Sequence, residues 1–282
     1  MEEFWIALRE YTFLQHALLA GILASIAAGL AGTYVVVKRI SLISGGIAHA
    51  ILGGLGVAYY YGVDPTKGAI VSALVAAVII GLVSLRARQH EDTIISALWA
   101  VGMAIGVLFI ARTPGYNVDL MTFLFGNILM VSTGDLAMIA ALDGLIVLVV
   151  VAFYKEFLAL AFDEEHARLR GLPVEILYLV LLMLIALTVV ILIKIVGLIL
   201  VIALLTLPPA IACRRASSIA KMMVSAICLS LIFNTTGLAL SYQLDLPTGA
   251  TIVIIAGIAY MLSLALDRAK GSKVFGRLRR TL

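Results

Sequence analysis

The stretch ISLISGGIAHAILGGLGVAYYYG, residues 40–62, is apolar and long enough to cross a bilayer as one helix, which takes about 20 residues. Every fourth residue lies on one stripe of such a helix, and the stripe is small except for a single imidazole: Ser41, Gly45, His49 and Gly53. Small residues let another helix approach closely, and an ionisable ring at membrane depth marks a functional route. We therefore expect His49 to lie on a pathway through the membrane, lined by this stripe and by the hydroxyl of Ser44.

The composition extends this prediction to the whole chain. Of the 282 residues, 63% are hydrophobic and 13% are charged, and the mean hydropathy is +1.15. No soluble core of this size needs so much apolar surface, so the apolar runs are predicted to be spans. They fall at residues 13–37, 40–61, 67–85, 93–111, 135–154, 174–193, 196–213, 219–242 and 249–266. We predict an all-α fold: a polytopic transmembrane helical bundle of eight or nine spans, forming a single domain over 1–282.

The basic residues predict the orientation. Of the 20 Lys and Arg, all but Arg9, Lys67, Arg112 and Lys194 fall in loops and a tail that alternation of the spans places on one side. Cytoplasmic loops carry such an excess, so the C-terminus is predicted to be cytoplasmic, and nine crossings would put the N-terminus outside. Because the net charge of +4 is gathered in these loops, it does not indicate nucleic-acid binding. The two cysteines lie in apolar runs and indicate neither a disulfide framework nor a Cys-type zinc site.

The runs 174–193 and 196–213 are predicted to form a hairpin around Lys194. Within the second run, Pro208 and Pro209 remove two backbone N–H groups and are predicted to break the backbone hydrogen-bond ladder near the cytoplasmic face. Such a break is tolerated at membrane depth only where neighbouring protein covers the freed carbonyls.

Residues 113–132, TPGYNVDLMTFLFGNILMVS, do not have the pattern of a span. A Pro-Gly turn is followed by Asp119, which is suited to cap a helix that runs to about Val131. Such a helix rises only about 18 Å, too short to cross the membrane. We predict a re-entrant or outer half-helix with Asp119 at the outer mouth, either as a plain N-cap or as a group that handles cations.

The segment KEFLALAFDEEHARLRGLP, residues 155–173, is predicted to contain a short helix outside the membrane, at about 163–171. Asp163 can cap it, Glu164 can pair with Arg168 one turn later, and Gly171 suits the left-handed position at its end.

The chain carries no G-x-x-x-x-G-K-[ST] motif, so it does not hydrolyse a nucleotide through a P-loop. An imidazole is a common ligand of transition-metal ions, although a single histidine in a span also serves as a packing residue. Asp143 lies inside the run 135–154, as either a polar partner or a pathway residue.

Five stretches, in order along the chain, resemble the membrane permease subunits of prokaryotic ATP-binding-cassette importers for zinc, manganese and iron. They are RISLISGGIAHAILGGLGVAY, VDLMTFLFGNILMVSTGDL, FDEEHARLRGLP, VGLILVIALLTLPPAIA and LDLPTGATIVI. The third looks like the E-A-A-x-x-x-G coupling motif of such permeases, with Glu165, Ala167 and Gly171 matching and His166 in place of the middle alanine. The first departs from the family, which usually has an aspartate where this chain has Gly45, four residues before His49.

The resemblance implies a permease subunit that moves divalent transition-metal ions, zinc or manganese, into the cytoplasm across the prokaryotic plasma membrane. Implied partners are a second copy of the chain, P-loop ATPase subunits bound to the helix capped by Asp163, and an external metal-binding protein. ATP acts only through the ATPase subunit, and no cofactor is bound permanently, so the chain is a transport subunit and not an enzyme. Because Gly45 cannot ligate, further ligands for an ion at His49 are sought among the acids in the spans or at the outer side: Asp119, Asp143 and Asp245. The alternatives are a stand-alone secondary metal/proton transporter and a permease for a metal chelate such as a siderophore or cobalamin.

Overall fold

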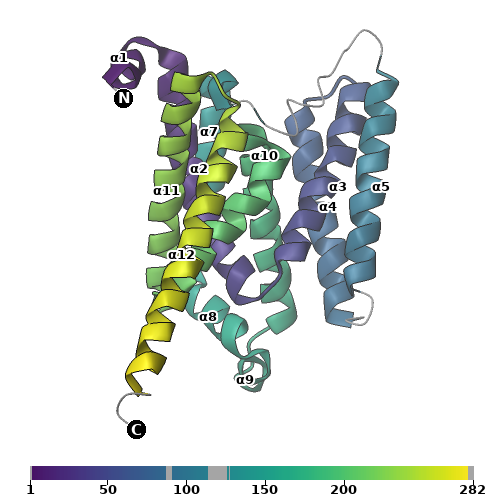
Figure 1. The fold of residues 1–282 in the computed structure, drawn as a ribbon. Coiled ribbons are helices and arrows are strands. Elements are labelled where there is room, and N and C mark those ends of the chain that lie inside the picture. The colour runs from purple at the N-terminus through teal and green to yellow at the C-terminus, as the bar shows by residue number, and fades with distance from the viewer. Residues whose placement is uncertain (1, 87–90, 114–125, 127, 279–282) are drawn as a thin grey trace.

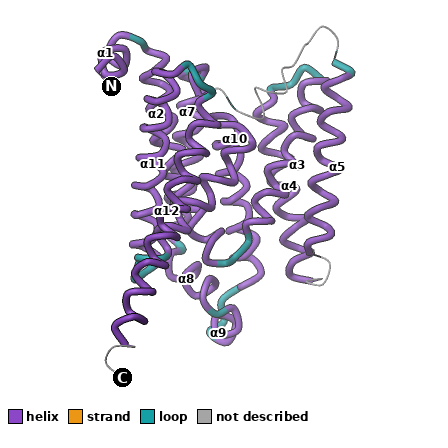
Figure 2. Tube along the Cα trace, in the orientation of Figure 1, coloured by secondary structure: helices purple, strands orange, loops and turns teal. Residues whose placement is uncertain are grey.

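The computed structural model describes residues 2–86, 91–113, 126 and 128–278, and no strand occurs within these ranges (Figures 1 and 2). The long helices are α2 (Thr12–Val37), α3 (Ser41–Tyr60), α4 (Pro65–Arg86), α5 (Glu91–Ala111), α7 (Thr133–Ala152), α10 (Val174–Cys213), α11 (Ile219–Leu244) and α12 (Thr248–Leu278). The short ones are α1 (Glu2–Glu10), α8 (Tyr154–Phe162), α9 (Glu164–Leu169) and the 3₁₀ turn η2 (Ile128–Met130).

The predicted polytopic bundle is confirmed. Eight helices among the described residues are long and apolar enough to cross a membrane, and their bounds follow the predicted runs within a few residues. The ninth run, 196–213, is the shorter apolar helix Leu200–Cys213. The predicted half-helix before α7 falls mostly on residues outside those that the structure describes, and η2 is its described part.

The two halves of α10 meet at Gly197, whose φ of 78° and ψ of 170° interrupt the helix. Glycine adopts this left-handed conformation at no steric cost. Just before it, Lys194 pairs with Asp135 at the start of α7, whereas Arg214, after the end of α10, pairs with Asp267 of α12. The second half therefore returns across the bundle, and the hairpin predicted around Lys194 is confirmed with its turning point at Gly197.

The predicted break at Pro208 and Pro209 is one of the hydrogen-bond ladder alone, because both prolines lie inside the helix, which continues to Cys213. Pro209 has no N–H to offer Leu205 four residues earlier. The Leu205 carbonyl oxygen lies against Gly32 of α2, 2.5 Å from the position that a Cβ of Gly32 would occupy. A close-packed neighbouring backbone thus covers the freed carbonyl, and the helix keeps its course.

The long helices form two groups (Figure 1). In one, α3 packs against both α4 and α5, and glycines bring α3 and α5 into backbone contact: a Cβ on Gly56 would lie 2.5 Å from the Gly106 carbonyl oxygen. In the other, α2 and the first half of α10 are mostly buried, with α7, α11 and α12 around them. The two groups join where α10 packs against α3 and α4.

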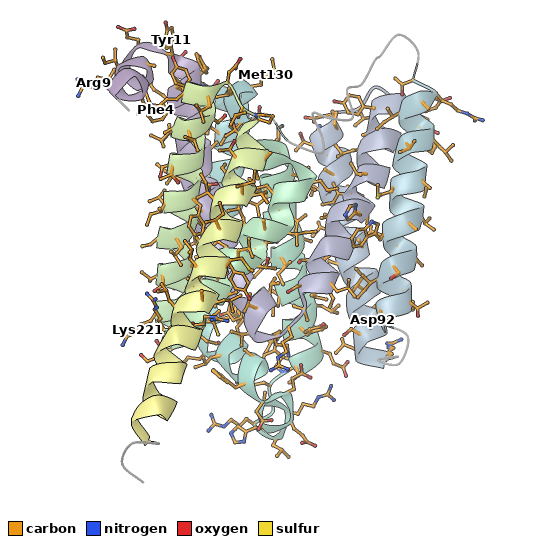
Figure 3. The ribbon with its side chains drawn as sticks, viewed as in Figure 1. Phe4, Arg9, Tyr11, Asp92, Met130 and Lys221 are labelled. Atoms are coloured by element: carbon orange, nitrogen blue, oxygen red, sulfur yellow. The ribbon has the colours of Figure 1, made fainter. Side chains whose placement is uncertain are left out.

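The bundle has an N-terminal end and a C-terminal end, each called after the chain terminus that it carries. Arg9, Tyr11 and Met130 lie at the N-terminal end, and Asp92 and Lys221 lie at the C-terminal end (Figure 3). The short helix α9 protrudes beyond the C-terminal end (Figure 1).

Candidate transport and coupling sites

His49 lies near the middle of α3, half-buried, with its ring against α5. The imidazole stacks on the indole of Trp99, with 3.9 Å between ring centroids and 12° between planes. Its Nδ1 atom lies 3.1 Å from the sulfur of Met103. Trp99 and Met103 are four residues apart, so they present adjacent side chains on one face of α5.

The contact with Met103 defines the protonation of the ring. A thioether sulfur can accept a hydrogen bond but has no proton to donate, so Nδ1 must carry the hydrogen in this contact. In the neutral imidazole the lone pair is then on Nε2. An imidazole in this tautomer presents the Nε2 lone pair, through which it can bind a metal ion, and the group bonded to the other nitrogen sets the orientation of the ring.

The small residues predicted to line the pathway have different surroundings. Ser41 is partly exposed, and Ser44 is fully buried and donates its hydroxyl hydrogen bond to the Ser41 carbonyl at 2.8 Å. A Cβ on Gly45 would lie 3.5 Å from Ile202 and 3.7 Å from Trp99, which is ordinary van der Waals contact. The α3 surface one turn before His49 therefore has room for a small side chain.

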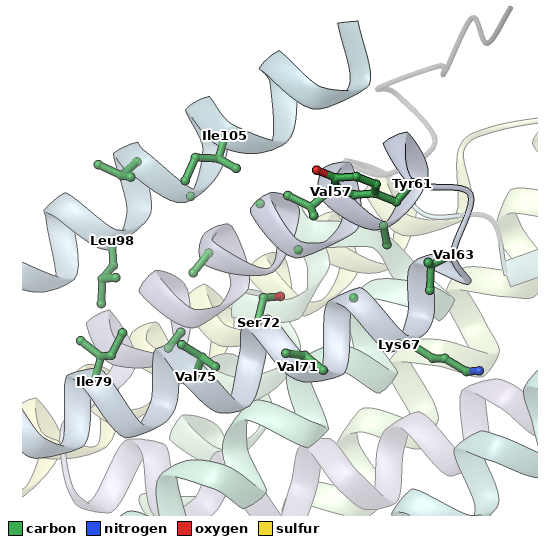
Figure 4. A pocket seen from close by; sticks show the side chains of 18 residues that line it. Val57, Tyr61, Val63, Lys67, Val71, Ser72, Val75, Ile79, Leu98 and Ile105 are labelled. Atoms are coloured by element: carbon green, nitrogen blue, oxygen red, sulfur yellow. The ribbon is translucent and has the colours of Figure 1, made fainter. Parts of the chain in front are cut away.

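Gly53, one turn after His49, lies where α3 meets α5, because its Cβ would come within 3.0 Å of the Gly102 carbonyl oxygen. It also lines an apolar groove of about 610 Å³ between α3, α4 and α5. Figure 4 shows Val57, Val71 and Leu98 on the three walls of this groove. Its lining is almost entirely apolar, so it has few ligands to offer an ion.

The acids proposed as additional ligands do not gather at His49 within the part of the chain that the structure describes. No three of His, Cys, Asp and Glu lie close enough together there to hold a metal ion. Asp143 is buried in α7, and neither of its carboxylate oxygens has a hydrogen-bond partner. Asp245 is exposed and ends α11 in the left-handed conformation, with φ 52°. Asp119 lies outside the described residues.

The helix predicted at about 163–171 forms as α9. Asp163 is its N-cap, and the side chain accepts a hydrogen bond from the His166 backbone N–H at 2.9 Å. Gly171 has φ 77°, and the next residue, Leu172, donates its N–H to the carbonyl of the fully buried Ala167. These contacts close both ends of a helix that has little more than one turn.

The outer surface of α9 faces away from the bundle. Glu165 and His166 are exposed, and Leu169 is 85% exposed. Phe162, immediately before the cap of α9, is 73% exposed, so two large apolar side chains are exposed in this short segment. The predicted pairing of Glu164 with Arg168 is replaced by contacts to other elements, since Glu164 pairs with Lys38 of the α2–α3 turn and Arg168 with Glu175 of α10.

At the N-terminal end, the Lys194 ammonium lies 2.6 Å from the Asp135 carboxylate and donates to the Thr66 hydroxyl at 2.9 Å. These groups border a cavity of about 360 Å³ that Asp64 and Met130 also line. The Thr66 backbone N–H, 2.8 Å from the Asp64 carboxylate, is the main cause that lowers the pKa of Asp64.

Eight helices that are long and apolar enough to cross a membrane, a histidine near the middle of one of them and a capped helix beyond one end are features of a membrane transport protein. The family model described as the ABC 3 transport family matches residues 10–267, so the chain belongs to that family.

Named relatives and a solved structure agree with this. An uncharacterized membrane protein of Synechocystis sp. is 47% identical over 268 residues, 95% of each chain. A manganese transport system membrane protein of Halalkalibacterium halodurans is 32% identical over 95% of this chain and 92% of its own. The structure of PsaBC from Streptococcus pneumoniae in complex with a Fab matches with a TM-score of 0.85 and 32% identity, over 93% of this chain and 94% of that one.

Sequence reasoning did not identify the partners of His49 or the roles of two lysines. Trp99 and Met103 carried a usable signal, because their spacing puts them on the face of α5 next to the glycines that bring α3 close. Lys38 served only to orient the spans, and Lys194 served also to locate the hairpin. Nothing in their local sequence indicates the segments that they join.

Proposed function

We propose that this protein is the membrane permease subunit of an ATP-driven importer that moves a divalent transition-metal ion, manganese or zinc, into the cytoplasm. The name of the Halalkalibacterium relative supports manganese as cargo. The imidazole of His49 equally suits zinc. The protein is a single transport domain without its own ATPase chemistry, and ATP is hydrolysed by a partner subunit.

The observation that carries this proposal is α9. A helix of this length has no stability of its own, yet a side-chain cap, a buried alanine and a left-handed glycine hold it beyond the bundle. Its exposed Glu165, His166 and Leu169 offer a docking surface for a soluble protein. A cytoplasmic P-loop ATPase that binds there can transmit its closure to the spans, with the C-terminal end of the bundle on the cytoplasmic side of the prokaryotic plasma membrane.

The cargo route passes His49. Among the residues that the structure describes, one protomer supplies one imidazole and no carboxylate beside it, and Gly45 occupies the preceding turn of α3. A homodimer with its two-fold axis along the route brings a second His49 to the same level, and few ligands hold an ion weakly enough for it to leave. The ion arrives from an external metal-binding protein at the N-terminal end, near Asp119 and Asp245.

One observation favours a second candidate, a secondary transporter coupled to protons. The Asp143 carboxylate is buried in α7 without a hydrogen-bond partner, and such groups in spans often relay protons. That protein would transport without an ATPase and would have no use for the exposed surface of α9.

The docking surface can be tested with Leu169→Glu. We expect this change to reduce both co-purification of the ATPase and uptake of radiolabelled manganese in cells. Leu246→Glu changes a leucine that is 46% exposed between α11 and α12, and it should leave ATPase co-purification unchanged. Unchanged ATPase binding and uptake in the Leu169 variant, or uptake in a strain without the ATPase, would contradict the proposal.

A further inference from the structure

Lys38 connects the coupling helix to the part of the chain that precedes the His49 helix. Its ammonium forms an ion pair with Glu164 at the start of α9, a residue 126 positions later in the chain. It also donates a hydrogen bond to the Leu160 carbonyl of α8 at 3.1 Å. The ammonium lies 5.6 Å from the centroid of the Tyr178 ring of α10, within cation–π range. One side chain therefore contacts all three elements that surround the coupling region.

The ion pair between Lys38 and Glu164 is partly shielded from solvent. The lysine side chain is 11% exposed and that of Glu164 is 29% exposed. Water screens such a pair less than it screens a surface pair, and removal of one partner leaves a charge poorly solvated. A second contact lies beside it, since the ring of Tyr34 on α2 packs edge-on against Phe157 of α8 at 5.6 Å.

The backbone at Lys38 is equally constrained. Only residues 38–40 separate α2 from α3. Arg39 takes the left-handed conformation with φ 58°, and the Arg39 and Ile40 N–H groups donate to the carbonyls of Val36 and Val35. This hydrogen-bonded turn has little freedom, so a displacement of Lys38 also displaces the start of α3. His49 lies two turns further along the same helix.

We propose that Lys38 is a positioning residue for transport, and that the Lys38–Glu164 ion pair transmits the movement of α9 to the α2–α3 turn and so to the helix that carries His49. The inference rests on the proposed function, because it requires an ATPase that moves α9. The inference goes beyond the proposed function because it identifies how α9 acts on α3, which is through the Lys38 side chain. The covalent chain from α9 to α10 is a second route.

The test compares metal ions transported per ATP hydrolysed by the permease–ATPase complex in proteoliposomes, with the external metal-binding protein supplied. Lys38→Met keeps most of the aliphatic stem and removes the charge, and Glu164→Gln removes the other charge from a more exposed position. Each should lower the ratio about fivefold or more while ATP hydrolysis continues. Lys38→Arg keeps the cation and should retain most of the ratio.

A double-mutant cycle separates a connection from two independent effects. If the two charges act as a pair, Lys38→Met combined with Glu164→Gln should be no worse than the poorer single variant. Glu175→Gln is the matched control, because it removes a nearby exposed ion pair whose side chains are 54% and 67% exposed, and the ratio should stay near wild type.

Two results would overturn the inference but not the importer function. One is a wild-type ratio of metal ions transported per ATP hydrolysed in both single variants, and the other is losses that multiply in the double variant. Absence of ATP-dependent uptake by the wild-type complex would instead overturn the proposed function, and the inference with it.

Discussion

At each end of the bundle, one lysine links segments that are far apart in the chain. The two lysines have different surroundings. At the C-terminal end, Lys38 is 11% exposed and contacts α8, α9 and α10 at once. At the N-terminal end, Lys194 is 30% exposed, borders a cavity of about 360 Å³ and joins α10 to the starts of α4 and α7. Solvent weakens the second connection more than the first.

The difference matches what each end has to do in the proposed transport cycle. An end that receives cargo must open at small cost, and the Lys194 contacts lie beside the glycine break at Gly197. An end that transmits force must stay connected while it moves, and Lys38 is held by both its backbone turn and its side-chain partners. The helix α3 runs between the two, with His49 near its middle.

The largest expected effect comes from introducing the same backbone strain at each end of the bundle and comparing metal uptake. Gly171 and Gly62 have φ of 77° and 67°, and a Cβ would meet nothing within 4 Å at either. Valine at either position therefore costs about 1–2 kcal/mol through the backbone alone. Gly171→Val should lower manganese uptake about tenfold or more, because α9 loses its defined end, whereas Gly62→Val should keep most uptake. Equal uptake in the two variants would remove the functional distinction between the ends.

Stability should follow the same order. Lys38→Met removes the ion pair with Glu164 and the hydrogen bond to the Leu160 carbonyl, and should cost about 2 kcal/mol. Lys194→Met removes a more exposed pair and should cost about 1 kcal/mol or less, with a cost that shrinks at high salt. Thermal unfolding of the purified protein in detergent, at low and high salt, measures both. A larger loss for the Lys194 variant would reverse the comparison.

A smaller effect is expected between the ends, at Met103. Met103→Leu keeps the volume but removes the sulfur that holds the Nδ1 hydrogen of His49. Uptake should fall a few-fold, less than the roughly tenfold loss that follows removal of stronger partners of metal-binding histidines. If manganese and zinc uptake by the Met103 variant were both unchanged, the tautomer would have no role in transport.

The smallest effect concerns Asp64 at the N-terminal end. Its pKa is lowered mainly by the Thr66 N–H, so the carboxylate stabilises the fold above its ordinary pKa of 3.8, and this contribution is lost as the pH falls through the lower folded value. Asp64→Asn should leave the free energy of unfolding at neutral pH within about 0.5 kcal/mol of the wild type. It should reduce only the fall in melting temperature at acid pH. An unchanged fall at acid pH would count against the assigned cause.

The sequence predicted the spans better than it predicted the contacts among them. Apolar runs and basic loops define where helices cross, and the bounds of α5, the hairpin near Lys194 and the capped helix α9 all follow from local residues. The sequence predicted that Pro208 and Pro209 interrupt the hydrogen-bond ladder, but it did not identify Gly32 of α2 as the neighbour that covers the freed Leu205 carbonyl.

The surroundings of His49 could not be predicted for the same physical reason. The Met103 sulfur lies 54 positions along the chain, and only the register between α3 and α5 brings it to Nδ1. Likewise, the partner of Glu164 was expected on its own helix, yet it is Lys38, which the fold brings from another segment. Long-range packing decides both contacts, and no local pattern encodes it.

The central claim is that ATP hydrolysis by a partner subunit docked on α9 drives a metal ion past His49, and uptake by proteoliposomes tests it most directly. Purified permease is reconstituted with its ATPase subunit, and entry of radiolabelled manganese is followed with ATP, without ATP and with an ATPase variant that cannot hydrolyse it. The account predicts saturable uptake that requires hydrolysis and is lost in His49→Ala. Uptake that continues without the ATPase, or that follows an imposed proton gradient instead, would contradict it.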